Sequence, residues 1–184
     1  MNLQYPAVPV ERLQEEFTQF HQYAFRLERL DHYDVEEERA QFEKFLSGAP
    51  APLSPPAEDQ GWLDLIREAT RHGKRFERVR VLRSPVPSYV RFEAQWGYRF
   101  SAAAGEIIRV HRGDEDVRLA ATSDDPFADF WLFDDARGYL LEYDASAQFQ
   151  RVREIPRERV HRYASLRCYL LRTSPLADID RDFA

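Results

Sequence analysis

The sequence is poor in cysteine, glycine and long apolar runs, and each shortage excludes a class of protein. A single cysteine, Cys168, cannot form an intramolecular disulfide or supply a thiolate zinc site. With only seven glycines, phosphate-binding loops are scarce, and no Walker, dinucleotide-binding or G-x-S-x-G motif occurs. No apolar stretch approaches the roughly 18 residues that a membrane span requires. We therefore expect no membrane association, no disulfide framework and none of the commonest nucleotide-binding signatures.

Positive charge is also in short supply. The 26 lysine and arginine residues face 32 aspartate and glutamate residues, which gives a net charge of -6 and a pI near 5.4. Such an acidic protein gains little from phosphate neutralisation, so direct nucleic-acid binding is not expected. The start of the chain lacks the basic and apolar regions of a secretory signal, which favours a cytoplasmic location. Basic residues are nevertheless dense between Arg67 and Arg83, where a small anion or an acidic peptide could dock.

The N-terminal part predicts two helices and a proline-rich connection. The first helix is predicted by apolar residues at helical spacing, namely Leu13, Phe17, Phe20 and Ala24. An extended segment is predicted to follow from Phe25. Asp34 and Glu37 have the spacing of a capping box, so we expect a second helix that ends at Gly48. Four prolines then predict a semi-rigid connection. The domain prediction is a helical arm at 1–48, a connection at 49–57 and a main domain at 58–184. We expect the three parts to form one folding unit.

The main domain alternates between helical and strand patterns. Its predicted elements are a helix through Trp62, Leu65, Ile66 and Ala69 ending near Gly73, strands at 75–82, 89–96, 106–111 and 149–154, a hairpin across 135–138, and a helix after Pro156. The acidic segment 113–129 is expected to be a loop. In the last helix we expect Cys168 to be a small buried residue rather than a nucleophile. The predicted fold is α+β, with a mostly antiparallel sheet flanked by helices and an N-terminal helical pair.

Two of the predicted strands alternate charged with apolar residues. The charged positions are Arg78 and Arg80 in RFERVRVL, and Arg91 and Glu93 in YVRFEAQW. Strand alternation would place these side chains on one face, opposite the valines. One interpretation is a set of exposed cross-strand ion pairs, each contributing about 0.2 to 1 kcal/mol. The other is a polar pocket beneath a helix, in which arginine forks hold a carboxylate or phosphate. Burial distinguishes them, because a concave, desolvated cluster favours ligand binding or catalysis.

Five segments carry a resemblance to a known family: AFRLERLDHYDVEEE, GWLDLIREATRHGKRFERVRVL, PSYVRFE, AAGEIIRV and DFWLFDD. Over nearly its whole length the chain resembles an actinobacterial family described as domain of unknown function 6879. Its members are often encoded beside helix-turn-helix regulators, which implies a role in regulation and no established reaction. The residues that match the family pattern are Arg26, Glu28, Arg78, Arg80, Arg91, Glu93, Glu106, Asp129 and Trp131. All of these except Glu106 are our candidates for ligand or partner binding.

Catalytic motifs are incomplete. His72 and Lys74 match the first half of the His-x-Lys-x4-Asp signature of phospholipase-D-type enzymes, but Val79 occupies the aspartate position. These residues are explained more simply as cations that complement the dipole at a helix C-terminus. A degenerate phospholipase-D-like fold remains an alternative. The five histidines show no H-E-x-x-H spacing, and we predict neither a metal nor a cofactor.

The sequence favours a non-enzymatic regulatory or protein-interaction module that acts with a DNA-binding regulator. The alternative is a ligand sensor or enzyme that acts on a small anionic or phosphoryl-containing molecule at the Arg/Glu face. Exposed aromatic residues, among them Trp96 and Tyr98, could also contribute to a protein interface. The predicted partners are thus a regulator protein or a small anionic ligand, and docking of the N-terminal arm on a second copy would give a homodimer.

Overall fold

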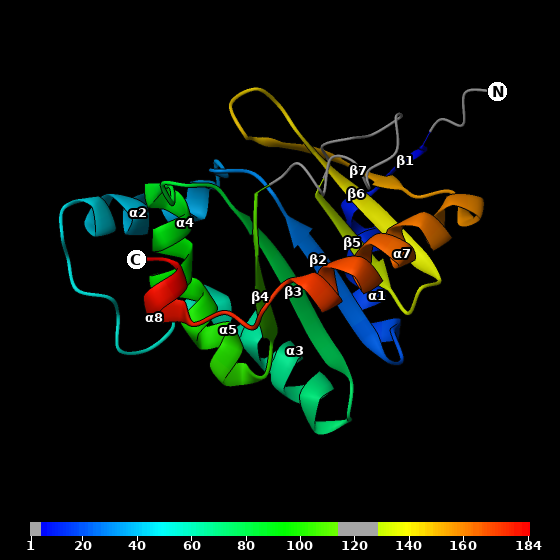
Figure 1. The fold of residues 1–184 in the computed structure, drawn as a ribbon, viewed down its shortest axis with the longest axis horizontal. Helices are drawn as coiled ribbons and strands as arrows, with labels where there is room; N and C mark the ends of the chain where they lie inside the picture. The colour runs from blue at the N-terminus through cyan, green and yellow to red at the C-terminus, as the bar shows by residue number, and fades with distance from the viewer. Residues whose placement is uncertain (1–4, 114–128) are drawn as a thin grey trace.

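A seven-stranded mixed sheet forms the centre of the molecule (Figure 1). The computed structural model describes residues 5–113 and 129–184. The strand order is β1-β7-β6-β5-β2-β3-β4. The strands are β1 (Ala7–Val8), β2 (Tyr23–Glu28), β3 (Arg75–Leu82), β4 (Ile107–Arg112), β5 (Asp129–Phe133), β6 (Arg137–Tyr143) and β7 (Phe149–Glu154). Four of the six pairings between these strands are antiparallel, whereas β3 runs parallel to both β2 and β4. The expected α+β class is confirmed, and the sheet is mixed.

Helices cover both faces of the sheet. Their bounds are α1 (Val10–Gln19), α2 (Arg39–Leu46), α3 (Gln60–Arg71), α4 (Ser88–Glu93), α5 (Arg99–Ala104), α7 (Arg157–Thr173) and α8 (Ile179–Asp182), with short 3-10 helices η1 (Glu36–Glu38) and η2 (Ala57–Asp59). Helix α7 covers one face. Helices α1, α3, α4 and α5 cover the other face, and α2 packs outside α4. Among the described residues, no helix is long and apolar enough to cross a membrane.

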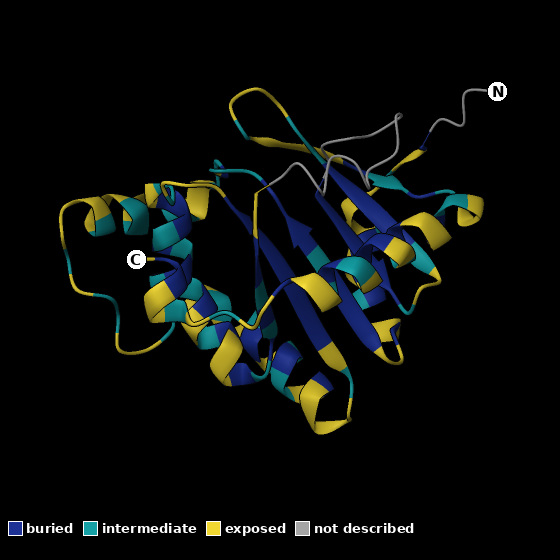
Figure 2. Cartoon of the chain, viewed as in Figure 1, coloured by how far each residue is buried: buried dark blue, intermediate teal, exposed yellow. Residues whose placement is uncertain are grey.

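Both faces of the central strands are buried (Figure 2). Strand β3 shows this most clearly, because Phe76 through Leu82 are all buried. Its odd-numbered valines, Val79 and Val81, face α7 and join the core cluster there. Its even-numbered arginines therefore lie under the helices of the opposite face. Of the two interpretations of the charged face, exposed ion pairs are wrong for β3, because a second helical layer covers this face.

The predicted strand at 89–96 is wrong. Residues 88–104 form a helical segment in which the π-helix η3 (Ala94–Tyr98) joins α4 to α5. Tyr89, Phe92 and Trp96 pack toward α2, while Val90, Ala94 and Tyr98 pack toward the sheet, each set at helical spacing. Two apolar helical faces interleaved in one sequence look like strand alternation, which is the physical reason for the error. Gly97 accordingly lies within the π-helix.

The N-terminal helices form without forming a pair. Strand β2 lies between them in sequence and occupies the sheet interior, hydrogen-bonded to β3 and β5. Helix α1 packs on the sheet with α3, whereas the aromatic residues of α2 pack against α4. The predicted capping box is absent, because the Asp34 carboxylate pairs with Arg39 and the helical turn begins at Glu36. An N-terminal helical pair is therefore not confirmed.

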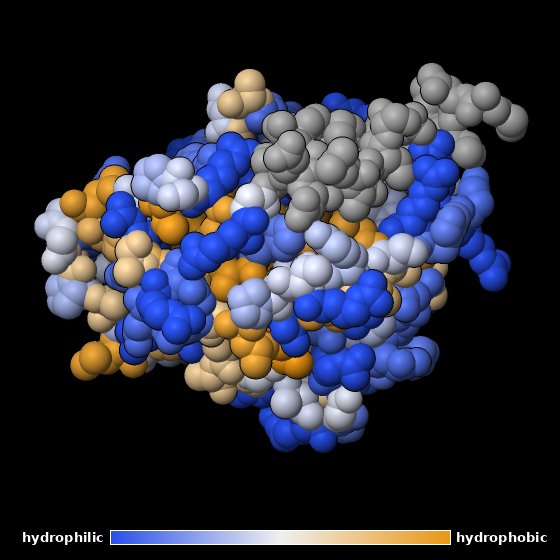
Figure 3. All heavy atoms as spheres, in the orientation of Figure 1, coloured by the Kyte–Doolittle hydropathy of each residue, from blue (hydrophilic) through white to orange (hydrophobic). Residues whose placement is uncertain are grey.

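Several smaller expectations have clear outcomes. The strands at 75–82 and 149–154, the hairpin and the closing helix are confirmed. Cys168 is exposed on α7, so its predicted burial is wrong; the buried stripe of that helix is formed by neighbours such as Leu166 and Leu170. Nearly all of the predicted acidic loop, residues 114–128, lies outside the described residues. Over α7, hydrophilic and hydrophobic residues are interspersed on the molecular surface (Figure 3).

Candidate functional site

A cluster of buried ion pairs lies on the face of the sheet opposite α7. Strands β2 and β3 run parallel, and their register places Arg26 beside Arg78 and Glu28 beside Arg80. Alternation directs these four side chains to the same face. Glu93 reaches the cluster from α4 and Glu106 from the residue before β4. We call these six residues the Arg–Glu network.

Glu28 is the centre of the network. Its Oε1 atom lies 2.8 Å from Arg26 Nε and 2.6 Å from Arg78 Nη1. Its Oε2 atom accepts a hydrogen bond of 2.6 Å from the Tyr98 hydroxyl. Arg78 also binds Glu106, with 2.9 Å between Nε and Oε1. Glu28 therefore holds two guanidinium groups together where β2 and β3 lie side by side.

Arg80 is fully buried and is held from three sides. Its Nη2 atom lies 3.2 Å from Glu93 Oε2 and donates to the Leu30 carbonyl at 2.6 Å. Its Nη1 atom donates to the Tyr33 hydroxyl at 3.3 Å. A buried guanidinium without such partners would be costly, so these contacts are needed for Arg80 to occupy the interior.

Asp129 and Trp131 extend the network onto β5. The Asp129 carboxylate accepts hydrogen bonds from the Arg29 backbone N–H at 3.0 Å and from the Tyr33 hydroxyl. Trp131 pairs with Arg26 across the sheet, and the Arg26 guanidinium lies 5.3 Å from the centre of the indole ring. Through Tyr33, which also binds Arg80, Asp129 is linked to the rest of the cluster.

Burial and neighbouring charges shift the carboxyl pKa values in opposite directions. Burial raises the pKa of Glu93 to about 8, against the lowering effect of Arg80 and with a further rise from Glu28. Burial also raises the pKa of Asp129 to about 6. For Glu28 burial acts in the same direction, but the three surrounding arginines outweigh it and hold its pKa well below the usual range. The surrounding arginines thus favour the ionised form of Glu28, whereas burial favours the protonated form of Glu93.

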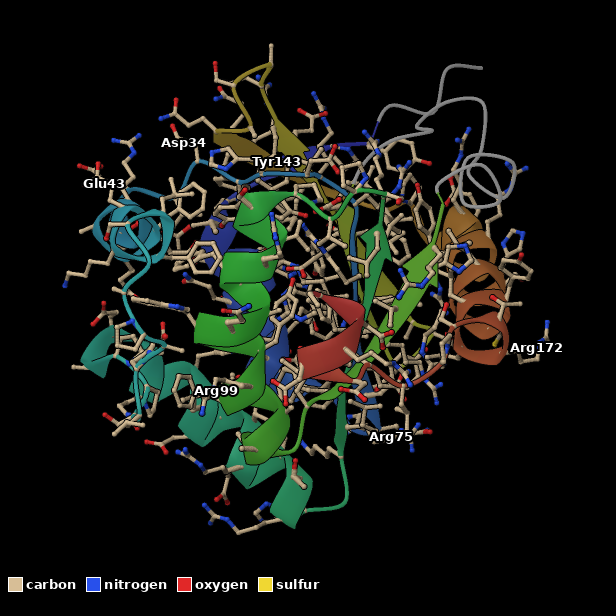
Figure 4. The ribbon with its side chains drawn as sticks, turned by 60° about the vertical axis from the view of Figure 1, so that its left-hand side comes forward. Asp34, Glu43, Arg75, Arg99, Tyr143 and Arg172 are labelled. Carbon is tan, nitrogen blue, oxygen red and sulfur yellow. The ribbon has the colours of Figure 1, made fainter. Side chains whose placement is uncertain are left out.

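The network forms part of the floor of a cleft of about 660 Å³. The aromatic residues that line this cleft are Phe17, Tyr33, Trp62, Tyr89, Phe92, Trp96, Tyr98, Phe100, Trp131, Tyr143 and Phe149. Figure 4 looks onto the side where α2, α3 and α4 gather, with the labelled Tyr143 near the upper end of α4. The chain has three tryptophans, and all of them line the cleft. A concave, largely aromatic pocket of this size is typical of small-molecule binding sites.

Four carboxylates from two 3-10 helical turns also line the cleft. These rim carboxylates are Glu37 and Glu38 from η1, and Glu58 and Asp59 from η2. The Tyr89 hydroxyl donates to Glu38 at 2.6 Å, and the Gln41 side-chain amide donates to Glu58 at 2.9 Å. No lysine or arginine in the described part of the chain forms an ion pair with any of the four. The rim is therefore a region of uncompensated negative charge.

The π-helix lies in the wall of the cleft. The element η3 begins directly after Glu93, and three of its residues line the cavity: Trp96, Gly97 and Tyr98. A π-turn widens the helix locally and often occurs at functional sites. A Cβ atom built on Gly97 would meet no other atom within 4 Å. The glycine thus leaves open space at this point of the wall.

Seven of the eight candidate site residues come together in this region. Arg26, Glu28, Arg78, Glu93 and Trp131 line the cleft, while Arg80 and Asp129 lie in the second layer behind it. Arg91 does not line the cleft, although it lies on α4 two residues before Glu93. The strand prediction had placed Arg91 and Glu93 on one face, but on a helix residues two apart point in different directions.

The phospholipase-D-like half-motif lies away from the cleft. His72 caps the C-terminal end of α3, and its Nδ1 atom lies 2.9 Å from the Glu68 carbonyl oxygen. The Lys74 ammonium donates to the Phe20 carbonyl at 2.6 Å. Both contacts are those of a helix end and its connection to β3. No group of three or more potential metal ligands occurs in the parts of the chain that the structure describes.

Sequence reasoning missed the residues that complete the cleft. Trp96 was noted only as a candidate for a protein interface, and Trp62 only as a core residue of its helix. The helical spacing of Tyr89, Phe92 and Trp96 is the signal that could have found this aromatic wall. The rim carboxylates carry no comparable signal, because the two turns that hold them are separated in sequence by the proline-rich connection.

The site and the fold together define a class: an α+β domain with a mixed sheet that carries an aromatic, carboxylate-rimmed cleft over buried ion pairs. The profile of a family described as a domain of unknown function (DUF6879) matches residues 11–176. The chain belongs to this family. The match includes every member of the Arg–Glu network and the rim. No curated protein matches the sequence.

Proposed function

We propose that this chain is a non-enzymatic regulatory module that binds a small organic ligand in the cleft and acts with a DNA-binding regulator. The observation that carries the first part is the cleft itself, about 660 Å³ in volume, with 11 aromatic side chains among the residues that line it. Its floor contains charged groups that are costly to bury. A concave apolar pocket with a few fixed polar groups and shifted pKa values is the usual form of a ligand site.

The arginines of the floor are better suited to shaping the pocket than to binding an anion. Arg78 is already held by Glu28 and Glu106, and Arg26 by Glu28. A phosphate or carboxylate ligand would have to displace these internal carboxylates from guanidinium groups that are bound to them. A small anionic or phosphoryl-containing ligand, the alternative from the sequence, is therefore less well supported than one that uses the aromatic walls.

The proposed regulator is supported by the sequence rather than by the site. The resemblance described above implies an actinobacterial origin and genes placed beside helix-turn-helix regulators. The net charge of -6 disfavours direct binding of this chain to DNA, so a partner would make that contact. In this proposal both proteins act in the cytoplasm, and occupancy of the cleft alters their association.

A pair of glycine substitutions tests the proposal. Gly97→Leu places a side chain in open space at the cleft wall, while Gly61→Leu does the same on α3 at a position that does not line the cleft. Both substitutions remove a helical glycine, so both should preserve or slightly increase the free energy of unfolding. Each variant and the wild type would be tagged, recovered from the native cells and denatured, and the released small molecules identified by mass spectrometry.

We expect the wild type and Gly61→Leu to release the same organic ligand, and Gly97→Leu to release none. Calorimetry with the purified helix-turn-helix protein encoded beside the gene then tests the second part, with a predicted difference in affinity between the ligand-bound and ligand-free chain. Equal recovery of the ligand from all three proteins, or no ligand from the wild type, contradicts binding in the cleft. No interaction with the regulator in either state contradicts the regulatory part.

A further inference from the structure

The charges that line the cleft are strongly unbalanced, and this imbalance bears on the ligand of the proposed function. Among the described residues that line it, six carboxyl groups face two guanidinium groups. Glu28 pairs with both arginines, Arg26 and Arg78. The remaining carboxyl groups are Glu93 and the four rim carboxylates. Even with Glu93 protonated, the rim leaves an excess of negative charge at the mouth of the cleft.

The walls of the cleft add a second form of attraction for positive charge. The faces of aromatic rings carry negative electrostatic potential, and cations bind over them within about 6 Å of the ring centre. Within this chain, Arg26 already lies over Trp131 and Arg78 lies 4.8 Å from the centre of the Tyr98 ring. The rings of Trp62, Trp96 and Tyr89 line the same cavity. An aromatic cage with carboxylates at its entrance is complementary to an organic cation.

Two rim carboxylates have no internal partner. The side chains of Glu37 and Asp59 form no hydrogen bond or ion pair with other described residues, and Arg39, which interacts electrostatically with Glu37, is paired with Asp34 instead. Burial raises the pKa of Asp59, with Glu58 adding to the rise, and burial also raises that of Glu38. A cation bound between the two turns would relieve the cost of this negative charge. The rim therefore favours a positively charged ligand over a neutral one of the same shape.

A donor in the wall indicates a further feature of the ligand. Trp96 is 7% exposed, and its indole Nε1 atom is buried with no hydrogen-bond partner among the described residues. An unpaired buried donor costs about 1 to 3 kcal/mol. Because Trp96 lines the cleft, an acceptor atom of a bound molecule would satisfy this N–H group. This observation is independent of the rim carboxylates, and it also points to an occupant of the cleft.

We infer that the cleft binds a small organic cation, with an ammonium or guanidinium group near the rim, an apolar body between the aromatic walls and an acceptor atom for Trp96. The inference rests on the proposed ligand-binding function and specifies its chemical class. It differs from the anionic ligand that the arginine pattern alone predicts, because those arginines are neutralised within the protein.

Three probes that share a phenyl group but differ in charge test this inference. They are benzyltrimethylammonium, benzyl alcohol and phenyl phosphate, titrated into the purified full chain by calorimetry at pH 7. Tryptophan fluorescence gives a second readout, because all three tryptophans line the cleft. We expect the cation to bind at least about tenfold more tightly than the neutral probe, the effect of a cation–aromatic contact in a desolvated site. Phenyl phosphate should not bind.

A matched pair of double variants tests whether the rim carboxylates cause the preference for the cationic probe. Glu37→Gln/Asp59→Asn removes two unpartnered rim carboxylates, whereas Glu36→Gln/Glu43→Gln removes two exposed carboxylates that do not line the cleft. Glu43 points outward from α2 in Figure 4. Both variants change the net charge equally. The rim variant should lose most of the preference for the cation, and the control should keep it.

The outcomes separate this inference from the proposed function. Equal or tighter binding of benzyl alcohol or phenyl phosphate overturns the cationic assignment, but it leaves ligand binding in the cleft intact if Gly97→Leu abolishes it. An equal loss of cation binding in the control variant also overturns the assignment, since it shows a nonspecific charge effect. If no probe binds and the wild type releases no native ligand, both the inference and the proposed function fail.

Discussion

The two faces of the central sheet are similarly buried but differ in how many charged side chains they carry. Toward α7, strands β2, β3 and β5 contribute mainly apolar side chains and one buried ion pair, between Glu77 and Arg167 of α7. These apolar residues are Phe25, Leu27, Val79, Val81, Phe130 and Leu132, all nearly inaccessible to solvent. Toward the cleft, the same strands contribute Arg26, Glu28, Arg78, Arg80, Asp129 and Trp131. Because side chains alternate along a strand, both sets are specified by neighbouring positions in the same short segments.

This difference distinguishes the side chains that stabilise the fold from those that serve recognition. Apolar burial on the α7 face is a sufficient source of stability, at about 25 cal/mol per Å² of buried apolar area. Buried ion pairs contribute less, since desolvation offsets their attraction and apolar replacements are often neutral or stabilising. A face that keeps two buried arginines, Arg78 and Arg80, beside a cleft is better explained by recognition than by stability.

The largest expected effect comes from removing one partner of a buried pair. Arg80→Met leaves Glu93 and Glu28 without this guanidinium group and removes its hydrogen bonds to Leu30 and Tyr33. We expect the free energy of unfolding to fall by about 3 to 5 kcal/mol. Urea denaturation followed by circular dichroism measures this change. A loss below about 1 kcal/mol would show that the pair is effectively solvated.

A truncation on the opposite face sharpens the comparison. Leu132→Ala removes a fully buried side chain from the α7 core and should cost about 2 to 5 kcal/mol through lost burial and the resulting cavity. Because Leu132 points away from the cleft, the folded variant should bind benzyltrimethylammonium with unchanged affinity. Calorimetry on samples shown to be folded checks this. Weakened binding would mean that the two faces are not functionally separate.

The dependence of stability on pH gives a smaller, graded effect. The pKa of Glu93 is about 8 in the folded chain, above its ordinary value, so the folded state binds the proton more tightly than the unfolded state. Its contribution to stability is present at acidic pH and is lost as the pH rises toward 8. Glu93→Gln imitates the protonated group. Relative to the wild type, the free energy of unfolding of this variant should increase by up to about 1.4 kcal/mol per pH unit as the pH rises toward 8.

Denaturation of both proteins between pH 5 and pH 9 makes this measurement. Glu43→Gln provides the control, because it changes the charge equally at an exposed carboxyl group of α2. If Glu93→Gln instead becomes less stable relative to the wild type as pH rises, Glu93 is ionised and forms a conventional ion pair with Arg80.

The fold was predictable where one periodicity dominates a segment. Strand β3 and the stripe of α7 have a single buried pattern each, and their sequences indicate them directly. Residues 88–104 were not predictable in this way, because Val90, Ala94 and Tyr98 interleave with a second buried set on another face of the same helix. The buried π-turn adds to the ambiguity, since it shifts the helical spacing.

The candidate site was predictable only in its charged floor. Strand alternation and the family resemblance both indicated Arg78 and Arg80, and the structure places them beside Glu28 and Glu93. The sequence could not show that the charges neutralise one another, since this depends on strand register and on a helix that folds over them. For the same reason the ligand of the alternative drawn from the sequence was anionic, whereas the rim turns around Glu37 and Asp59 favour a cation.

The most direct test of the account replaces a buried ion pair by apolar side chains. In Arg80→Met/Glu93→Leu, neither side chain of this pair is left as a buried polar group without its partner, so most of the stability lost in Arg80→Met should return. The same sample is then titrated with benzyltrimethylammonium. The account predicts a folded protein with weakened cation binding, because Glu93 and Tyr33 both line the cleft and Arg80 holds them in position. A variant that fails to regain stability, or one that binds the cation like the wild type, would contradict the claim that this face serves recognition rather than the fold.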